Sequence, residues 1–143
     1  MRLVVDASVI VKWLLADRED ENDTSTALAL LSAFRDGAVS LIQPPHWLAE
    51  VAAVLTRLSP ATAADDITDL YALGIPAHDT PQAYLTAYDL ARELDHHLFD
   101  TLYHAVALEE KRALLVTADE HYYRKASACG AIVLLSDWAL PKR

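Results

Sequence analysis

The sequence has little of several residue types, and each scarcity excludes a class of protein. Cys129 is the only cysteine among 143 residues, so an internal disulfide and a cysteine-based zinc site are both excluded. Only three glycines are present, without any low-complexity tract, which indicates a compact, helix-rich chain. Lysine and arginine together number 12, against 21 aspartates and glutamates. The resulting formal net charge of -9 argues against a broad basic surface for nucleic acid.

Long hydrophobic runs are also missing. The stretch VIVKWLLA contains Lys12 and is far too short to span a bilayer. Asp6 interrupts the first apolar run, so we expect no signal peptide. Because a single cysteine suits a reducing compartment, we expect a cytoplasmic protein without a membrane segment.

The chain contains enough hydrophobic residues to form one core. Hydrophobic residues make up 53% of the chain, which excludes a disordered protein. The length predicts a single domain over residues 1–143. The acidic balance permits a basic partner or a carboxylate cluster that holds cations, and a plain soluble acidic protein is the simplest interpretation.

Short β-branched stretches alternate with helical patterns along the chain. Ser8 can cap a first helix and Thr24 or Ser25 a second, while Thr80 precedes Pro81 at the start of a later one. The alternation predicts the α/β class, with a parallel sheet covered by helices on both faces. We expect strands at residues 2–5, 39–42, 75–77, 113–117 and 131–135, and helices at 9–16, 26–36, 44–58, 61–73, 81–94, 96–111 and 119–128.

Four carboxylates differ from the others because apolar residues flank them. Asp6 follows LVV, Glu50 lies within WLAEVAAVL, Asp100 within HLFDTLYHAVAL, and Asp119 within LLVTADEHYY. Sites in parallel sheets form beyond the carboxyl ends of the strands, and Asp6 and Asp119 each follow a predicted strand. If all four converge, their like charges need a cation. An all-carboxylate pocket favours Mg²⁺ or Mn²⁺, and such an ion can activate water for attack on phosphorus.

Each carboxylate alone also has a simpler structural interpretation. Asp100 and Asp119 could be acids that favour the positive end of a helix dipole. Glu50 could pair with Arg57, and Asp6 could cap the helix that follows it. The metal site is therefore a hypothesis about the convergence of four residues, not about any one of them.

Together these four segments resemble the PIN-domain ribonucleases, especially the VapC-type toxins of toxin–antitoxin pairs. The matching pieces are VVDAS with Asp6, HWLAEVAAVL with Glu50, LFDTLYHAVAL with Asp100 and LLVTADEHYYRKA with Asp119, in the order of the family. The resemblance implies a PIN-like three-layer α/β/α sandwich with a central, mostly parallel sheet. It implies an endoribonuclease whose Mg²⁺ or Mn²⁺ is held by these four acids, a cognate antitoxin protein that inhibits it, and a homodimer.

Further residues gain candidate roles from the resemblance and from their positions. Ser8 and Thr117 match polar positions that the family places beside the acids, although either hydroxyl could simply cap a turn. Lys12, Arg124 and Lys125 are candidate contacts to RNA phosphates, with solvated surface charge as the alternative for each.

The histidines and one apolar helix are further candidates for function. No HxH or HExxH pattern supports zinc. His104 lies four residues after Asp100 and could touch the acids, but a partly buried core position is the commoner role. The apolar helix TALALLSAF is expected mainly in the core, and part of it could form, with Trp13 and Leu14, a groove for a partner or a second copy.

Other protein classes fit the sequence less well. Phosphotransferases of the haloacid-dehalogenase type need a second Asp two residues after Asp6, where Ser8 stands. Response-regulator receiver domains need an acid pair near the first strand and a late Lys after a strand, and neither is visible. The alternative from a different class is a non-catalytic PIN-like module that acts by binding a protein partner. The presence of all four acids disfavours it.

Overall fold

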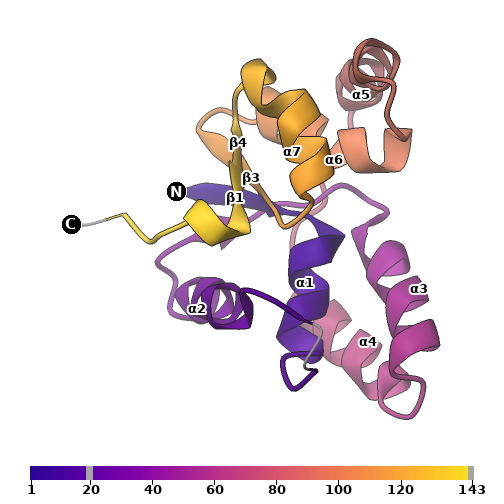
Figure 1. Cartoon of the computed structure of the whole chain (residues 1–143), viewed down its shortest axis with the longest axis vertical. Coiled ribbons are helices and arrows are strands. Elements are labelled where there is room, and N and C mark those ends of the chain that lie inside the picture. Colours follow the sequence, from indigo (N-terminus) through magenta and orange to yellow (C-terminus); the bar gives the residue numbers. More distant parts are fainter. Residues whose placement is uncertain (19–20, 142–143) are drawn as a thin grey trace.

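Four parallel strands form the centre of the computed structural model, which describes residues 1–18 and 21–141 (Figure 1). The order across the sheet is β2-β1-β3-β4, and every pairing is parallel. The predicted α/β class and parallel sheet are therefore confirmed. The strands are β1 (Arg2–Val5), β2 (Ser40–Leu41), β3 (Ala113–Thr117) and β4 (Ile132–Leu134).

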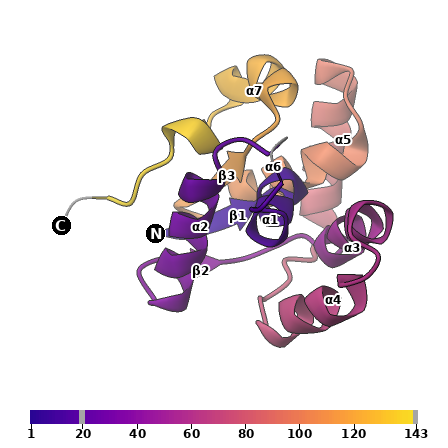
Figure 2. The ribbon, with the colours of Figure 1, turned by 60° about the horizontal axis from the view of Figure 1, so that its bottom comes forward.

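Helices cover both faces of this sheet and complete the expected three layers. In Figure 1, α1 and α2 lie on one side of the sheet, and α6 and α7 lie on the other. The α3–α4 pair stands beside α1, and α5 packs along α6 (Figure 2). The α-helices of the described residues are α1 (Ala7–Leu14), α2 (Thr24–Arg35), α3 (Trp47–Leu58), α4 (Ala63–Ala72), α5 (Pro81–Leu94), α6 (Leu98–Glu109) and α7 (Glu120–Ala126).

The core lies where the central strands meet the apolar helix faces. Leu3, Val4 and Val5 have no exposed surface, as expected for a parallel strand covered on both sides. On α5, the small side chains of Ala83 and Ala87 are buried, which allows α6 to approach closely. These buried strands fix the positions of the residues that follow them.

The strand order creates a switch point between β1 and β3. The chain leaves β1 toward β2 and leaves β3 toward β4, so the two connections run in opposite directions across the sheet. Val5 pairs with Val116, and the backbone N–H of Asp6 donates to the carbonyl of Val116 at 3.0 Å. Ligand sites of parallel sheets form at such points, beyond the carboxyl ends of the two strands.

The start of the first helix differs from the prediction. We expected Ser8 to cap a helix at residues 9–16, but α1 begins at Ala7 and ends at Leu14. Asp6 is its N-cap, with an extended backbone and a side chain that accepts from the backbone N–H of Ser8. Asp6 takes the place expected of Ser8 because an N-cap side chain accepts from the N–H two residues later, which here is the N–H of Ser8 itself.

The predicted strand at residues 75–77 is also wrong. Only Ala77 pairs there, in a single parallel bridge with Gln43. The fully buried side chain of Gln43 accepts from the N–H of Val5 at 2.7 Å and donates to its carbonyl at 2.8 Å. The amide thus satisfies the end of β1 where the two-residue β2 has already stopped.

Other helices begin near the predicted residues, but their capping residues do not always match the prediction. Thr80 caps α5 as predicted, accepting from the N–H of Ala83 at 3.1 Å. Helix α2 begins at Thr24, but Asp23 occupies the N-cap with a left-handed backbone and makes no side-chain cap bond. Helix α7 ends early at Ala126, and a 3₁₀ turn at 127–129 leads to Gly130, whose φ of 79° suits glycine.

The groove considered for a partner is small. Trp13 and Leu14 line a cavity of about 140 Å³ together with residues of α2 and α4. Helix α2 buries one face through Ala27 and Leu30, while Leu28 on its other face is 41% exposed. No helix within residues 1–18 and 21–141 combines the length and the apolar character needed to cross a bilayer.

Candidate metal centre

Asp6 stands at the end of β1 and is held in place by Ser8. Its Oδ2 atom accepts hydrogen bonds from the backbone N–H and from the hydroxyl of Ser8. Burial raises the pKa of Asp6 from 3.8 to about 6, and the negative charges of Asp100 and Glu50 add to this effect. The two hydrogen bonds from Ser8 lower the pKa and offset the rise only in part. Asp6 is thus a carboxylate whose negative charge is costly unless a cation is nearby.

Glu50 reaches the same region from the first turn of α3. One of its oxygens lies 3.2 Å from Nε2 of His46, which also contacts the carbonyl of Phe99 at 2.8 Å. Burial opposes the charge of both side chains, but their mutual contact outweighs it. The pKa of Glu50 is therefore lowered and that of His46 is raised. Glu50 is paired with His46 and not with Arg57, and this pairing keeps its carboxylate ionised.

Asp100 and Asp119 complete the group from the other face of the sheet. Asp100 lies in the first turn of α6, and its Oδ2 contacts Nε2 of His96 at 2.9 Å. Asp119 is the N-cap of α7, and its Oδ1 accepts from the backbone N–H of Tyr122 at 3.0 Å. The helix-terminal interpretation of both acids is therefore confirmed, but it does not remove either one from the site.

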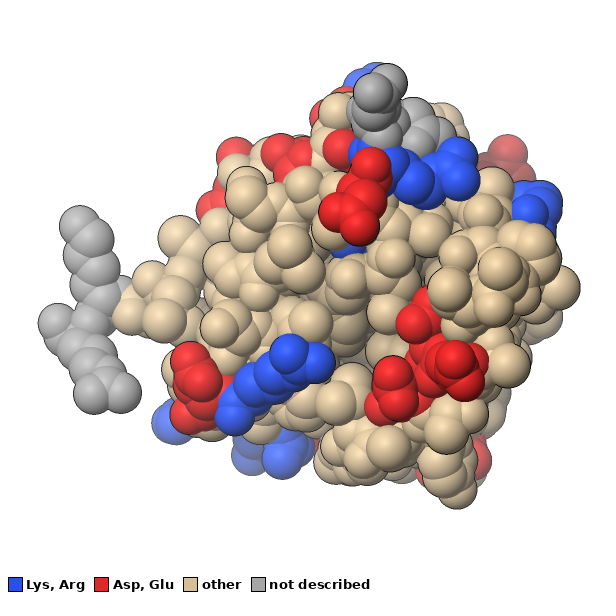
Figure 3. Space-filling view, turned by 90° about the horizontal axis from the view of Figure 1, so that it is seen from below, with Lys and Arg blue, Asp and Glu red and all other residues tan. Residues whose placement is uncertain are grey.

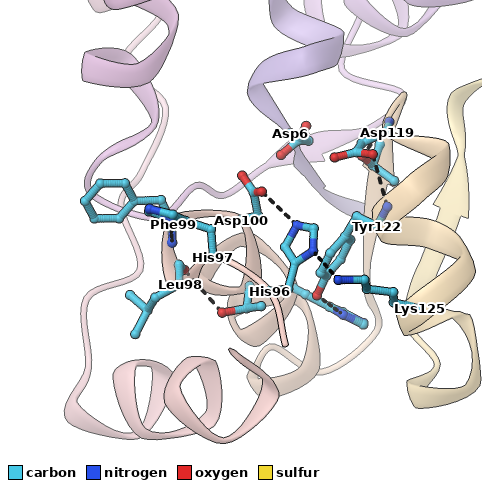
Figure 4. Close-up of polar contacts among 12 residues, drawn as sticks. Asp6, His96, His97, Leu98, Phe99, Asp100, Asp119, Tyr122 and Lys125 are labelled. Atoms are coloured by element: carbon cyan, nitrogen blue, oxygen red, sulfur yellow. Dashed lines mark hydrogen bonds and ion pairs between the residues drawn. The ribbon is translucent and has the colours of Figure 1, made fainter. Parts of the chain in front are cut away.

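All four carboxylates line one open pocket of about 440 Å³ at the switch point of the sheet. Figure 4 shows the carboxylates of Asp6, Asp100 and Asp119 facing a common space. Because carboxylate oxygens are the ligands that hard divalent cations prefer, these residues fit Mg²⁺ or Mn²⁺. A cation there would also offset the repulsion that raises the pKa of Asp6.

Comparison with known proteins agrees with this geometry. A family model described as PIN domain matches residues 3–128. The chain belongs to the PIN-domain family. PIN domains are in general metal-dependent nucleases, so membership supports a nuclease activity for this PIN domain. None of the curated proteins compared with the chain gives a match.

Two hydroxyls organise the turns of the PIN domain around its acids. The Ser8 hydroxyl donates to Asp6 and accepts from the backbone N–H of Ala118 at 3.1 Å. The buried hydroxyl of Thr117 accepts from the N–H of Asp119 at 3.1 Å. Both positions singled out in the sequence thus orient a carboxylate-bearing turn, and a direct role in catalysis stays a prediction.

The three predicted RNA contacts lie in different surroundings. Lys12 lines the pocket but is buried, with its ammonium 2.9 Å from Glu21. Arg124 is exposed on α7 and does not line the pocket. Lys125 donates to a backbone carbonyl at residue 95 and lies 3.4 Å from Nδ1 of His96, next to the acids. Lys12 is thus the one of the three that lines the pocket, Lys125 contacts a neighbour of the acids, and all three roles stay predictions.

His96 is the neighbour that sequence reasoning missed. One ligand atom from each of His96, Asp100 and Asp119 can be chosen so that all lie within 4.8 Å of one another. The spacing of four residues between His96 and Asp100 was a usable signal, because such pairs meet near a helix start. His104, which the sequence did single out, is instead fully buried between the Tyr122 hydroxyl and the carbonyl of Gly130.

Proposed function

We propose that this PIN domain is a Mg²⁺- or Mn²⁺-dependent endoribonuclease in which Asp6, Glu50, Asp100 and Asp119 hold the ion. One observation carries the proposal: four carboxylates from four separate elements converge on one pocket at the switch point of the sheet. Helix capping explains single members of this group. It does not explain why the cap of α1, the cap of α7 and Glu50 of α3 line the same space.

The lining residues of the pocket suit hydrolysis without a covalent intermediate. A divalent ion bound here would supply a Lewis acid that activates water and stabilises charge on the phosphate. Ser8, the lining hydroxyl, already donates to Asp6 and accepts from a backbone N–H, so it is engaged as a support. Glu50 is kept ionised by His46 and so provides a permanent negative charge for holding a cation.

The distribution of cations agrees with a metal-centred substrate site. On the face shown in Figure 3, lysine and arginine side chains of the described residues lie in small separate groups on a mostly uncharged surface. Contact with RNA phosphates would then depend on the bound ion and on a few cations such as Lys125. An open pocket, lined by both polar and apolar residues, leaves room for a single strand to approach.

We further propose that the protein is a VapC-type toxin that acts in the cytoplasm and is inhibited by a cognate antitoxin. The support is the order and spacing of the segments around the four acids, which resemble that group of PIN domains. A homodimer is expected on the same basis. Exposed apolar side chains suited to protein contacts lie on α5, namely Tyr84, Leu85 and Tyr88.

RNA cleavage with matched variants tests the proposed activity. We expect Asp100→Asn and Glu50→Gln to lower the rate of cleavage of a total RNA pool by about 100-fold or more, since removing even a support of a metal ligand costs 10–100-fold. Glu120→Gln is the control, because this carboxylate is adjacent to Asp119 in sequence but 70% exposed and paired with Arg124. It should cleave like the wild type.

A second measurement removes the dependence on the choice of RNA. Calorimetric titration of Mn²⁺ into the purified chain should show binding that Asp100→Asn and Glu50→Gln weaken and Glu120→Gln leaves unchanged. Undiminished cleavage by both site variants, or Mn²⁺ binding that neither affects, would contradict the proposal. Binding of a protein partner without cleavage or metal binding would favour a non-catalytic PIN-like module.

A further inference from the structure

We propose that His96 supplies a nitrogen ligand to the ion of this PIN domain, so that the centre prefers Mn²⁺ over Mg²⁺. The inference rests on the proposed function, because it concerns Asp100 and Asp119 of the same pocket. It goes further by assigning a ligand outside the four carboxylates, and with it an order of metal preference.

The three side chains are spaced closely enough to serve one ion after small adjustments. Nε2 of His96 lies 2.9 Å from Oδ2 of Asp100, and suitable atoms of His96, Asp100 and Asp119 fall within 4.8 Å of one another. Ligands on neighbouring corners of an octahedron are about 3 Å apart, and those on opposite corners about 4.2 Å, for bonds near 2.1 Å. The contact between His96 and Asp100 already has the spacing of neighbouring ligands, and a small shift of side chains within the 4.8 Å limit would bring all three onto one ion.

The imidazole ring is held facing this group. Its side chain is only 10% exposed, and the ring packs on Tyr122 with 4.7 Å between centroids. Figure 4 shows the ring between Asp100 and the ammonium of Lys125, which contacts Nδ1 at 3.4 Å. The edge of the ring that carries Nε2 is thus the edge turned toward the acids.

Coordination through Nε2 needs only a small change around the ring. With the ring proton on Nδ1, Nε2 would be free to bind the ion in place of its hydrogen bond to Asp100. Lys125 gives up its long contact with Nδ1 and keeps its 2.9 Å hydrogen bond to the carbonyl of Asp95.

A nitrogen ligand alters which ion binds best. Carboxylates and water suit Mg²⁺ and Mn²⁺ alike, whereas imidazole favours transition metals and adds little to the binding of Mg²⁺. A centre built from carboxylates and one imidazole should therefore bind Mn²⁺ more tightly than Mg²⁺. Removing the imidazole should reduce this preference rather than abolish metal binding.

The experiment compares wild type with His96→Gln and with His121→Gln as the matched control. His121 is an exposed histidine whose ring centroid lies 6.0 Å from that of His96, outside the ligand group. Calorimetry should show that His96→Gln raises the Kd for Mn²⁺ by about tenfold or more but changes the Kd for Mg²⁺ by less than about threefold. His121→Gln should change neither.

Pulsed electron paramagnetic resonance of the Mn²⁺-loaded chain gives a direct readout of the bond. The wild type should show coupling of Mn²⁺ to ¹⁴N, and labelling with ¹⁵N-histidine should alter it. The coupling should persist in His121→Gln and disappear in His96→Gln. The labelled wild type makes this test independent of whether the variant folds.

The possible failures are distinguishable. Mn²⁺ binding without nitrogen coupling, or a His96→Gln variant that weakens both ions equally, would overturn the inference and leave His96 as a residue that positions Asp100. The carboxylate centre itself would stand in that case. Absence of any Mn²⁺ binding by the wild type would overturn the proposed function together with the inference.

Discussion

Replacing Asp6 by Asn should stabilise the metal-free protein at neutral pH. The pKa of Asp6 is raised from 3.8 to about 6, chiefly by burial. The native state therefore holds the proton more tightly than the unfolded state, and the free energy of unfolding falls as the pH rises between these values. A difference of about two pH units, at ~1.4 kcal/mol each, corresponds to about 3 kcal/mol at pH 7.5.

Asparagine removes the buried charge while keeping the helix cap. Its side-chain oxygen can accept from the N–H of Ser8 as Asp6 does, and Asn and Asp are about equally good N-caps. Because Asp6 is half-buried and its charge is partly screened, we expect a gain of about 1–3 kcal/mol at pH 7.5. The gain should shrink to about 0.5 kcal/mol or less at pH 4.0, where the wild-type carboxylate is largely protonated.

Urea unfolding of both proteins in EDTA at the two pH values checks this reasoning. Added Mn²⁺ should narrow or reverse the difference at pH 7.5, because the ion stabilises only the protein that binds it well. A metal-free Asp6→Asn variant that is no more stable than wild type at pH 7.5 would refute the argument. So would a gain of the same size at pH 4.0, since burial of a charge could not then be its cause.

Two further predictions concern histidines away from the pocket. Burial disfavours the charged form of His78, but contacts to Glu109 and Glu110 at 2.6 and 2.9 Å outweigh it and raise its pKa above 6.5. The stability from this contact should be complete below pH 6.5 and be lost as the pH rises through the raised pKa. The check is the free energy of unfolding in urea for wild type and His78→Gln. A difference between the two proteins that stays constant from pH 6 to pH 9 would contradict the prediction. His104 is buried, and His104→Leu should leave the hydroxyl of Tyr122 buried and unpaired. The free energy of unfolding in urea should fall by about 1–3 kcal/mol, while the Kd for Mn²⁺ stays the same. A higher Kd for Mn²⁺ in the variant would instead assign His104 to the metal centre.

The sequence predicted the elements whose local signals agree with their packing. The runs LVV and ALLVT are apolar on both faces, which is the pattern of a parallel strand covered by helices on both sides. They form β1 and β3. Thr80 and Pro81 gave the start of α5 to the residue. Since Asp6 and Asp119 come right after the ends of these two strands, their placement at one edge of the sheet was predictable from the predicted strands alone.

The remaining details depend on contacts between distant parts of the chain. The segment at residues 75–77 looks like a strand, but it pairs only with the backbone of Gln43, which lies beyond the end of the two-residue β2. The partner of Glu50 was hidden only in part. His46 precedes Glu50 by four residues, the spacing at which helix side chains meet, whereas Arg57 lies two turns further along α3. The contact between the His46 ring and the carbonyl of Phe99 in α6 could not be read from the sequence.

The helix-cap role of the acids is compatible with the proposed metal site. Asp6 caps α1 through Oδ2 and Asp119 caps α7 through Oδ1, so each cap uses one carboxylate oxygen of its residue. The N–H groups that bind these oxygens fix the direction of the carboxylate, and the second oxygen of each residue is outside that cap. Capping therefore orients the pocket rather than competing with it. Convergence of the acids, which no single segment encodes, is the feature that distinguishes a metal centre from a set of helix starts.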